Sequence, residues 1–163
     1  MSKPSSIPWL ESPGCSLRKA ALALESRAKS AFGEWLSRFP WDWYVTLTFK
    51  KDPTFYQAEK AWEGWINGLR LTLKAQERPM PYYVRVTEYQ KRGVPHFHAL
   101  IGGVSGIRRL LFKDLWELHG FARVLPYNPR LGAGYYLGKY LAKDAGEIRF
   151  SNTFKRLAKS RRA

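Results

Sequence analysis

Two strand-like segments separated by a short turn constrain the fold of this chain most strongly. Residues 82–90 and 94–102 are rich in β-branched and aromatic side chains, and a Lys-Arg-Gly turn ending at Gly93 separates them. A three-residue hairpin loop typically places its last residue in the left-handed region, which glycine adopts readily. In that register Glu88 lies directly opposite His96. We therefore predict an antiparallel hairpin whose pairing is set by this turn.

Two histidines in the second strand of the hairpin indicate a metal site. His96 and His98 are two residues apart, so both imidazoles point to one face of the strand and Phe97 points to the other. Glu88 adds a carboxylate on the same face, because directly opposed residues have Cβ atoms about 4.5–5.5 Å apart. Two imidazoles and one carboxylate suit Mn²⁺ or Mg²⁺, and would also hold Zn²⁺. The alternative is a coincidental pair of surface histidines.

The rest of the chain predicts an α+β fold with a central antiparallel sheet and helices mainly on one face. Apolar residues recur at helical spacing in residues 16–38, 54–76, 107–119 and 131–143, and further strands are expected at 41–49, 121–127 and 147–150. We expect an irregular arm at 1–14, one domain at 15–152 and a basic tail at 153–163.

One of these helices, 107–119, carries four leucines that we expect to face the core. They are Leu110, Leu111, Leu115 and Leu118. If the helices cover one face of the sheet, the other face stays free for polar chemistry.

The helix at 131–143 combines tyrosines and lysines at regular spacing. Tyr136 and Tyr140 are four residues apart, as are Lys139 and Lys143, so the four side chains can share one edge of the helix. A phenol ionises near pH 10 and needs a nearby cation to become a good nucleophile. A divalent ion and lysine can also offset charge on a reacting phosphodiester. The alternative is an aromatic helix that packs its tyrosines into the core.

The charge balance points to a polyanionic partner. The 163 residues include 28 Lys and Arg against 13 Asp and Glu, a net charge of +15. Nucleic acid neutralises such a charge, and each contact with a phosphate releases a counterion. Our candidates for DNA contacts are basic residues around the hairpin and the helix at 107–119, namely Arg85, Lys91, Arg92, Arg108 and Arg109.

The same sequence gives little support to a membrane or an oxidising compartment. No apolar stretch approaches the roughly 20 residues of a spanning helix. Cys15 is the only cysteine, so an intrachain disulfide is excluded, and residues 1–14 lack the layout of a signal peptide. We expect a protein of the cytoplasm of a bacterial or archaeal cell.

Three motifs in order resemble the HUH endonuclease superfamily of rolling-circle replication initiators. Residues 45–49 resemble its first motif, Glu88 with residues 95–100 resembles its metal motif, and residues 136–143 resemble its nucleophile motif. The doubled Tyr-x-x-Lys unit is similar to that of two-tyrosine initiators such as the A proteins of small single-stranded DNA phages. The resemblance covers about 43–143 and implies an RRM-like α/β sandwich.

The reaction implied by this resemblance is transesterification at single-stranded or cruciform origin DNA of a plasmid or phage. It leaves a 5′-phosphotyrosine and a free 3′-hydroxyl that primes synthesis. The roles carried over are nucleophiles for Tyr136 and Tyr140, charge stabilisation for Lys139 and Lys143, and Mn²⁺ or Mg²⁺ binding for the glutamate–histidine set. No Gly-x-x-x-x-Gly-Lys loop is present, so a host helicase would supply unwinding.

Three alternatives remain open from sequence. An HUH-type transposase would perform the same cleavage for another purpose. A non-catalytic single-stranded nucleic-acid-binding protein would explain the charge and the aromatic residues, but not the glutamate–histidine set. A two-histidine RNA phosphodiesterase would need two separate His-x-Thr or His-x-Ser units, whereas this chain has one His-x-His followed by Ala99.

Overall fold

The computed structural model describes residues 13–90, 93–141 and 147–161, and its centre is a five-stranded antiparallel sheet. The strand order is β4-β1-β3-β2-β5. The strands are β1 (Trp43–Leu47), β2 (Tyr82–Tyr89), β3 (Pro95–Gly102), β4 (Ala122–Pro126) and β5 (Ile148–Phe150). Each lies inside a segment that the sequence predicted as a strand. The α+β class and the sandwich built on an antiparallel sheet are confirmed.

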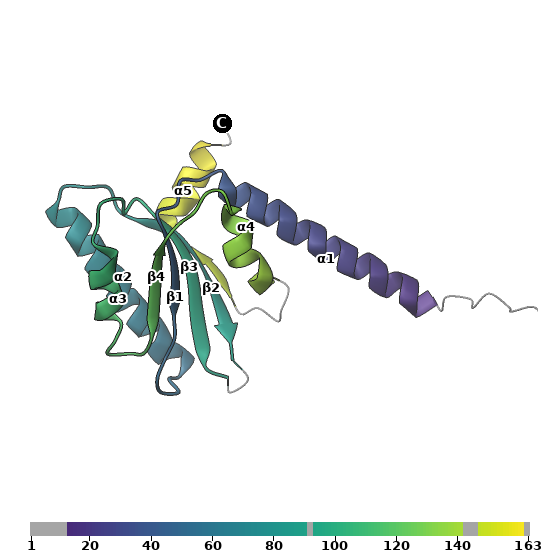
Figure 1. Ribbon diagram of the computed structural model, residues 1–163, viewed down its shortest axis with the longest axis horizontal. Coiled ribbons are helices and arrows are strands. Elements are labelled where there is room, and N and C mark those ends of the chain that lie inside the picture. Colours follow the sequence, from purple (N-terminus) through teal and green to yellow (C-terminus); the bar gives the residue numbers. More distant parts are fainter. Residues whose placement is uncertain (1–12, 91–92, 142–146, 162–163) are drawn as a thin grey trace, which may run out of the picture.

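Helices cover both faces of this sheet (Figure 1). They are α1 (Pro13–Ser37), α2 (Phe55–Ala75), α3 (Arg109–Leu115), α4 (Gly132–Leu137), the 3₁₀ helix η1 (Gly138–Leu141) and α5 (Asn152–Ser160). Helices α2 and α3 lie over one face, and α4, α5 and the end of α1 lie over the other. The expected placement mainly on one face was therefore incomplete.

The two faces are separated by the alternation of side chains along each strand. On β3, Phe97, Ala99 and Ile101 enter the core beneath α2, whereas Leu100 packs in a second cluster with Val84. Because alternate residues of a strand point to opposite faces, apolar residues at both parities require cover on both sides. One face nevertheless keeps polar residues toward the hairpin end of the sheet.

Helix α2 is fixed at its start by a capping box. The Thr54 side chain accepts a hydrogen bond from the backbone N–H of Gln57, and the Gln57 side chain accepts one from the backbone N–H of Thr54. The helix then buries Trp62, Trp65 and Leu69 against the sheet. This agrees with the helix predicted at 54–76.

Helix α3 is shorter than predicted and turns a different face inward. Phe112 and Trp116 are buried, and the Trp116 indole N–H donates to the Thr48 carbonyl at 2.9 Å. These aromatic side chains, one turn apart, occupy the space beside the sheet. The four leucines expected to face inward are 47–81% exposed: Leu110, Leu111, Leu115 and Leu118.

Helix α1 holds α4 by close backbone packing. A Cβ atom added to Gly33 would lie 2.6 Å from the Cα of Gly134, so the two helices meet where neither has a side chain. One turn later, Ser37 Oγ accepts a hydrogen bond from the Ala133 backbone N–H at 2.8 Å. The N-terminal half of α1 extends away from the body (Figure 1).

The segment expected as a basic tail forms helix α5. Ser151 caps the helix by accepting from the Phe154 backbone N–H, and Phe154 is buried with its ring centroid 4.8 Å from that of Phe39. A single aromatic side chain thus anchors a helix whose other residues are mostly basic or small. The expected arm at 1–14 falls largely outside the described residues, and its last two residues begin α1.

Candidate active site

The hairpin register that sequence predicted is present. Glu88 on β2 pairs with His96 on β3, and Gly93 has φ 76°, in the left-handed region. The Glu88 Oε2 atom lies 3.2 Å from His98 Nε2. The turn chemistry therefore places a carboxylate and an imidazole in contact on the sheet face that α4 partly covers.

The imidazole of His98 is oriented from the neighbouring strand. Its Nδ1 atom lies 3.2 Å from Thr46 Oγ1 and 3.3 Å from the Tyr44 hydroxyl oxygen. Thr46 is the cross-strand partner of His98 on β1. Such contacts hold the ring in place and leave its Nε2 atom directed toward Glu88.

His96 lies on the same face as His98, because the two residues are at one parity of β3. Within the parts of the chain that the structure describes, no group of three His, Cys, Asp or Glu side chains is close enough to hold a metal ion. Glu88 and His98 are thus the part of the expected ligand set that this conformation brings into contact.

Tyr140 stacks directly on His98. The two rings are 3.9 Å apart between centroids and inclined by 15°. Tyr140 is 4% exposed, and burial raises the pKa of its phenol, whereas a hydrogen bond with Tyr44 lowers the pKa and the nearby Glu88 carboxylate raises it. The late helix and the middle hairpin therefore meet at this tyrosine.

Tyr136 has a different environment. Its hydroxyl oxygen accepts a hydrogen bond from the Asn128 backbone N–H at 3.0 Å, and its ring packs 4.7 Å from Tyr44 and 5.2 Å from Tyr127. It is 7% exposed. The structure thus brings one of the two predicted nucleophiles to the histidine and places the other one turn away in an aromatic cluster.

Four of the predicted basic residues cannot be placed by their side chains. Lys91, Arg92 and Lys143 lie outside the described residues, as does the side chain of Lys139, whose backbone belongs to η1.

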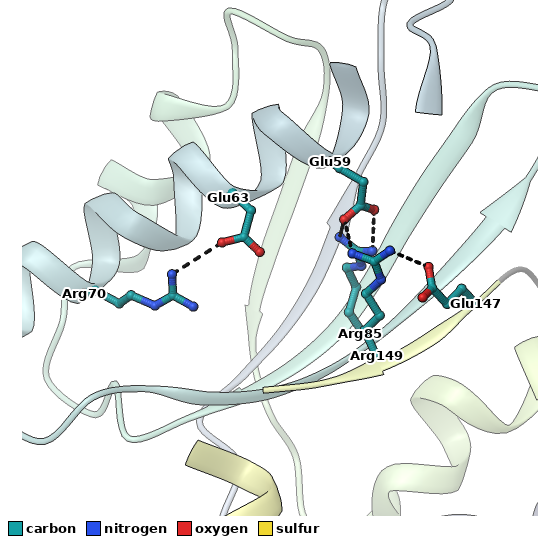
Figure 2. A network of polar contacts seen from close by, with 6 residues as sticks. All are labelled: Glu59, Glu63, Arg70, Arg85, Glu147 and Arg149. Atoms are coloured by element: carbon teal, nitrogen blue, oxygen red, sulfur yellow. Dashed lines mark hydrogen bonds and ion pairs between the residues drawn. The ribbon is translucent and has the colours of Figure 1, made fainter. Parts of the chain in front are cut away.

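Arg85 was assigned incorrectly as a DNA contact. It is fully buried beneath α2, where its guanidinium donates to Glu59 at 2.5 and 3.3 Å and lies over the ring of Phe97 (Figure 2). Glu59 also accepts from Arg149 at 2.6 Å. Arg85 points to the face opposite the histidines, and its charge is neutralised inside the protein.

Arg108 and Arg109 also lie away from the histidine face, at the start of α3. Arg109 donates to the Val124 carbonyl at 2.8 Å and so ties α3 to β4. Arg108 is exposed. The structure does not bring either residue to Glu88 and His98.

Sequence reasoning did not single out Arg123. It is exposed on β4 directly opposite Thr46, so it shares the sheet face of His98. The alternation in the strand predicted at 121–127 placed Arg123 opposite the apolar residues Ala122 and Val124, but which strand lies beside it was needed to connect it to the site.

The comparisons with known proteins agree with this arrangement at the level of the family. A family model for the ORF2 type of replication-associated protein matches residues 42–145, which is more than half of the chain and includes the hairpin and α4. The chain belongs to this family. Its members are replication-associated, so the match supports a role in initiating DNA replication. Neither a curated protein nor a solved structure matches the chain.

The helices give no sign of a membrane segment. Across residues 13–90, 93–141 and 147–161, none is both long and apolar enough to cross a bilayer.

Proposed function

We propose that this member of the ORF2 family of replication-associated proteins is an initiator endonuclease of rolling-circle replication. It nicks single-stranded origin DNA by metal-assisted attack of a tyrosine and keeps the 5′ end as a phosphotyrosine. The observation that carries the proposal is the stacking of Tyr140 on His98, whose Nε2 atom faces Glu88.

The residues on this face fit a divalent metal. Ligand atoms at right angles on an octahedral ion are about 3 Å apart when each bond is about 2.1 Å, and Glu88 Oε2 and His98 Nε2 are 3.2 Å apart. Metal binding at Nε2 requires a proton on Nδ1, which the Thr46 hydroxyl oxygen is placed to accept. His96 would complete the set from the same face. Mn²⁺ or Mg²⁺ bound there would polarise the phosphodiester and stabilise a phenolate.

Tyr140 is the first nucleophile in this proposal. Its phenolic oxygen forms a bond to phosphorus, and the bond from phosphorus to the 3′ oxygen breaks. The 3′ oxygen takes up a proton in exchange for the one that the phenol loses. The free 3′-hydroxyl then primes synthesis. Tyr136, one turn earlier, would attack the regenerated origin while Tyr140 still holds the old end.

Access to the phenol requires η1 to move. Both tyrosines are buried against the sheet, so substrate reaches Tyr140 only when the Gly138–Leu141 segment lifts from β3. Short 3₁₀ segments have weaker hydrogen-bond geometry than α-helix and often act as hinges. Lys139 and Lys143 would then contact the scissile phosphate, while Lys91, Arg92 and Arg123 would hold the backbone of the substrate.

A covalent adduct tests the proposal. The protein is incubated with a pool of 3′-labelled single-stranded oligonucleotides that carry hairpins, with Mn²⁺, and separated under denaturing conditions. We expect labelled protein that forms in Mn²⁺, is absent in EDTA and is lost when Tyr136→Phe and Tyr140→Phe are combined. A DNA shift without any covalent species would instead identify a non-catalytic single-stranded DNA-binding protein.

Support of replication separates an initiator from an HUH-type transposase, because cleavage is common to both. The gene is placed on a plasmid whose only origin is the DNA that forms the adduct. Plasmid maintenance supports the initiator, and movement of the flanking DNA without maintenance supports the transposase.

A further inference from the structure

A wide groove lies between α2 and α3, on the sheet face opposite the histidines. It has a volume of about 1010 Å³. Its walls come from the first half of α2, the end of α3 and the segment that follows β1. None of the residues proposed above for metal binding or nucleophilic attack lines it.

The groove is basic. Lys50, Lys51 and Lys60 line it together with one carboxylate, Asp52. Lys50 Nζ is held at the rim by the Glu117 carbonyl, at 3.2 Å. Three ammonium groups around a groove attract a chain of phosphates, and the long stems of lysine can follow a flexible backbone.

An aromatic ring is available at the mouth of the groove. Tyr56, in the first turn of α2, is 67% exposed, and Lys60 lies one turn on with its Nζ 5.4 Å from the centre of the Tyr56 ring. Single-stranded nucleic acid is bound without sequence preference by this combination of stacking ring and basic groove. An exposed tyrosine beside lysines therefore favours unpaired DNA over an acidic peptide, which has no planar bases to stack.

Glycines keep the groove open. Gly64 and Gly68 line it one turn apart in the middle of α2, and a Cβ atom at Gly64 would meet nothing within 4 Å. Each glycine inside a helix costs about 1 kcal/mol relative to alanine. The helix thus gives up stability at the positions where side chains would fill the groove.

The groove and the histidine site meet at one end of the sheet. Leu47, the last residue of β1, pairs with Phe97 between the two histidines, and the chain then passes through Lys50, whose backbone N–H donates to the His119 carbonyl. His119 also lines the groove. A strand that crosses the histidine face toward the end of β1 therefore reaches the groove by turning around the edge of the sheet.

We infer that this groove binds a second segment of single-stranded DNA, the part that leads away from the nicked phosphate. Its phosphates lie on Lys50, Lys51 and Lys60, and one base stacks on Tyr56. The inference rests on the proposed function for its ligand, since it takes the substrate of the histidine site to be single-stranded DNA.

Equilibrium binding with oligonucleotides of two lengths tests the groove. The full chain is titrated against fluorescent single strands of about 8 and about 24 nucleotides, because only the longer one can occupy both sites. The charge-reversed variant Lys51→Glu with Lys60→Glu should bind the long strand at least 10-fold more weakly and lose about one unit of salt slope per lost phosphate contact. The control Arg18→Glu with Arg27→Glu makes the same charge change on the projecting part of α1.

Two uncharged variants separate the groove from general electrostatics. Gly64→Gln fills the groove with a good helix former, and Tyr56→Ala removes the stacking ring, which should cost about 10-fold in affinity for the long strand. Neither should change affinity for the short strand. Equal losses in the groove variant and the α1 control, or no loss with Gly64→Gln, would overturn the inference.

Photo-crosslinking gives a readout that does not depend on cleavage. Iododeoxyuridine placed along the long strand should crosslink to Tyr56, and polyglutamate of matched charge should fail to compete. Competition by polyglutamate at the same concentration as DNA would reject nucleic acid as the ligand. Absence of any covalent adduct with crosslinking intact would reject the nicking chemistry and keep the groove.

Discussion

The ring of Tyr140 lies parallel to the imidazole of His98, with the two centroids 3.9 Å apart. Tyr136, by contrast, gives its hydroxyl to the Asn128 backbone N–H. The nearer phenol should therefore react first. We expect Tyr140→Phe to reduce initial adduct formation at least 100-fold, on the order of the loss of a group that acts in the transition state. Tyr136→Phe should retain the first cleavage and lose the second.

Single-turnover cleavage of a labelled origin strand, followed by rejoining to a second strand, distinguishes these steps. If Tyr136→Phe abolished the first adduct while Tyr140→Phe retained it, the assignment of the two phenols would be reversed.

The contact between Thr46 and His98 should tune metal affinity. Replacing Thr46 by Val removes the oxygen that lies 3.2 Å from His98 Nδ1 and keeps the shape of the side chain. Loss of a partner that orients a metal-bound histidine typically costs 10–100-fold in affinity, on the order of one to two powers of ten. Calorimetric titration with Mn²⁺ measures this loss. Thr48→Val, which removes a hydroxyl that donates to the Phe121 carbonyl, should leave Mn²⁺ affinity unchanged.

Arg85 should matter for stability and not for DNA binding. Removing its side chain leaves Glu59 facing the buried site with only Arg149 as partner. Breaking a buried ion pair by removing one member costs about 3–5 kcal/mol. Urea unfolding of Arg85→Ala measures the cost. DNA affinity of the folded fraction should match that of the wild type, and a large loss of affinity at unchanged stability would restore Arg85 as a DNA contact.

Two helical glycines should respond in opposite ways to alanine. At Gly33 the new Cβ atom would lie 2.6 Å from the Cα of Gly134, and overpacking of this kind costs about 1–3 kcal/mol. At Gly64 the Cβ atom meets nothing within 4 Å, so alanine should stabilise the protein by about 0.5–1 kcal/mol. Thermal or urea unfolding of both variants compares them. Equal and favourable changes would show that α1 and α4 do not pack through their backbones.

Tyr82 should make stability fall at alkaline pH. Burial, with a smaller contribution from the Asp42 carboxylate, raises the pKa of Tyr82 to about 12 from 10.0, although Arg161 lowers it. Between these values the unfolded chain has lost the phenolic proton that the folded chain keeps, so the free energy of unfolding declines as pH rises. Below pH 10 the effect is absent. Urea unfolding at pH 9 to 12 should show a shallower decline for Tyr82→Phe than for the wild type.

The hairpin and its register were predictable because their determinants are local. The position of Gly93 fixes which residues face each other, and alternation then puts Glu88 and His98 on one face. The contact of Tyr140 with His98 could be proposed only through the family resemblance. It depends on how α1 packs on α4, through Gly33 and other residues about a hundred positions away.

The errors came from residues whose environment is set by distant partners. Arg85 reads as a surface cation in a strand, and nothing near it in the chain shows that Glu59 of α2 will neutralise it. In α3 the leucines outnumber the aromatic residues, yet the larger Phe112 and Trp116 fill the space beside the sheet. Helix α5 was missed because one buried residue, Phe154, secures it.

Strand β3 encodes the histidine site and the core in alternate letters of a single eight-residue segment. Inserting or deleting one residue inside it would exchange the imidazoles with Phe97 and Ala99, sending the first pair under α2 and the second into solvent. Mutations that change the length of the gene product by a codon can therefore survive in the turns that flank β3, but not within it. Natural variation of this strand is restricted to replacement of one side chain by another.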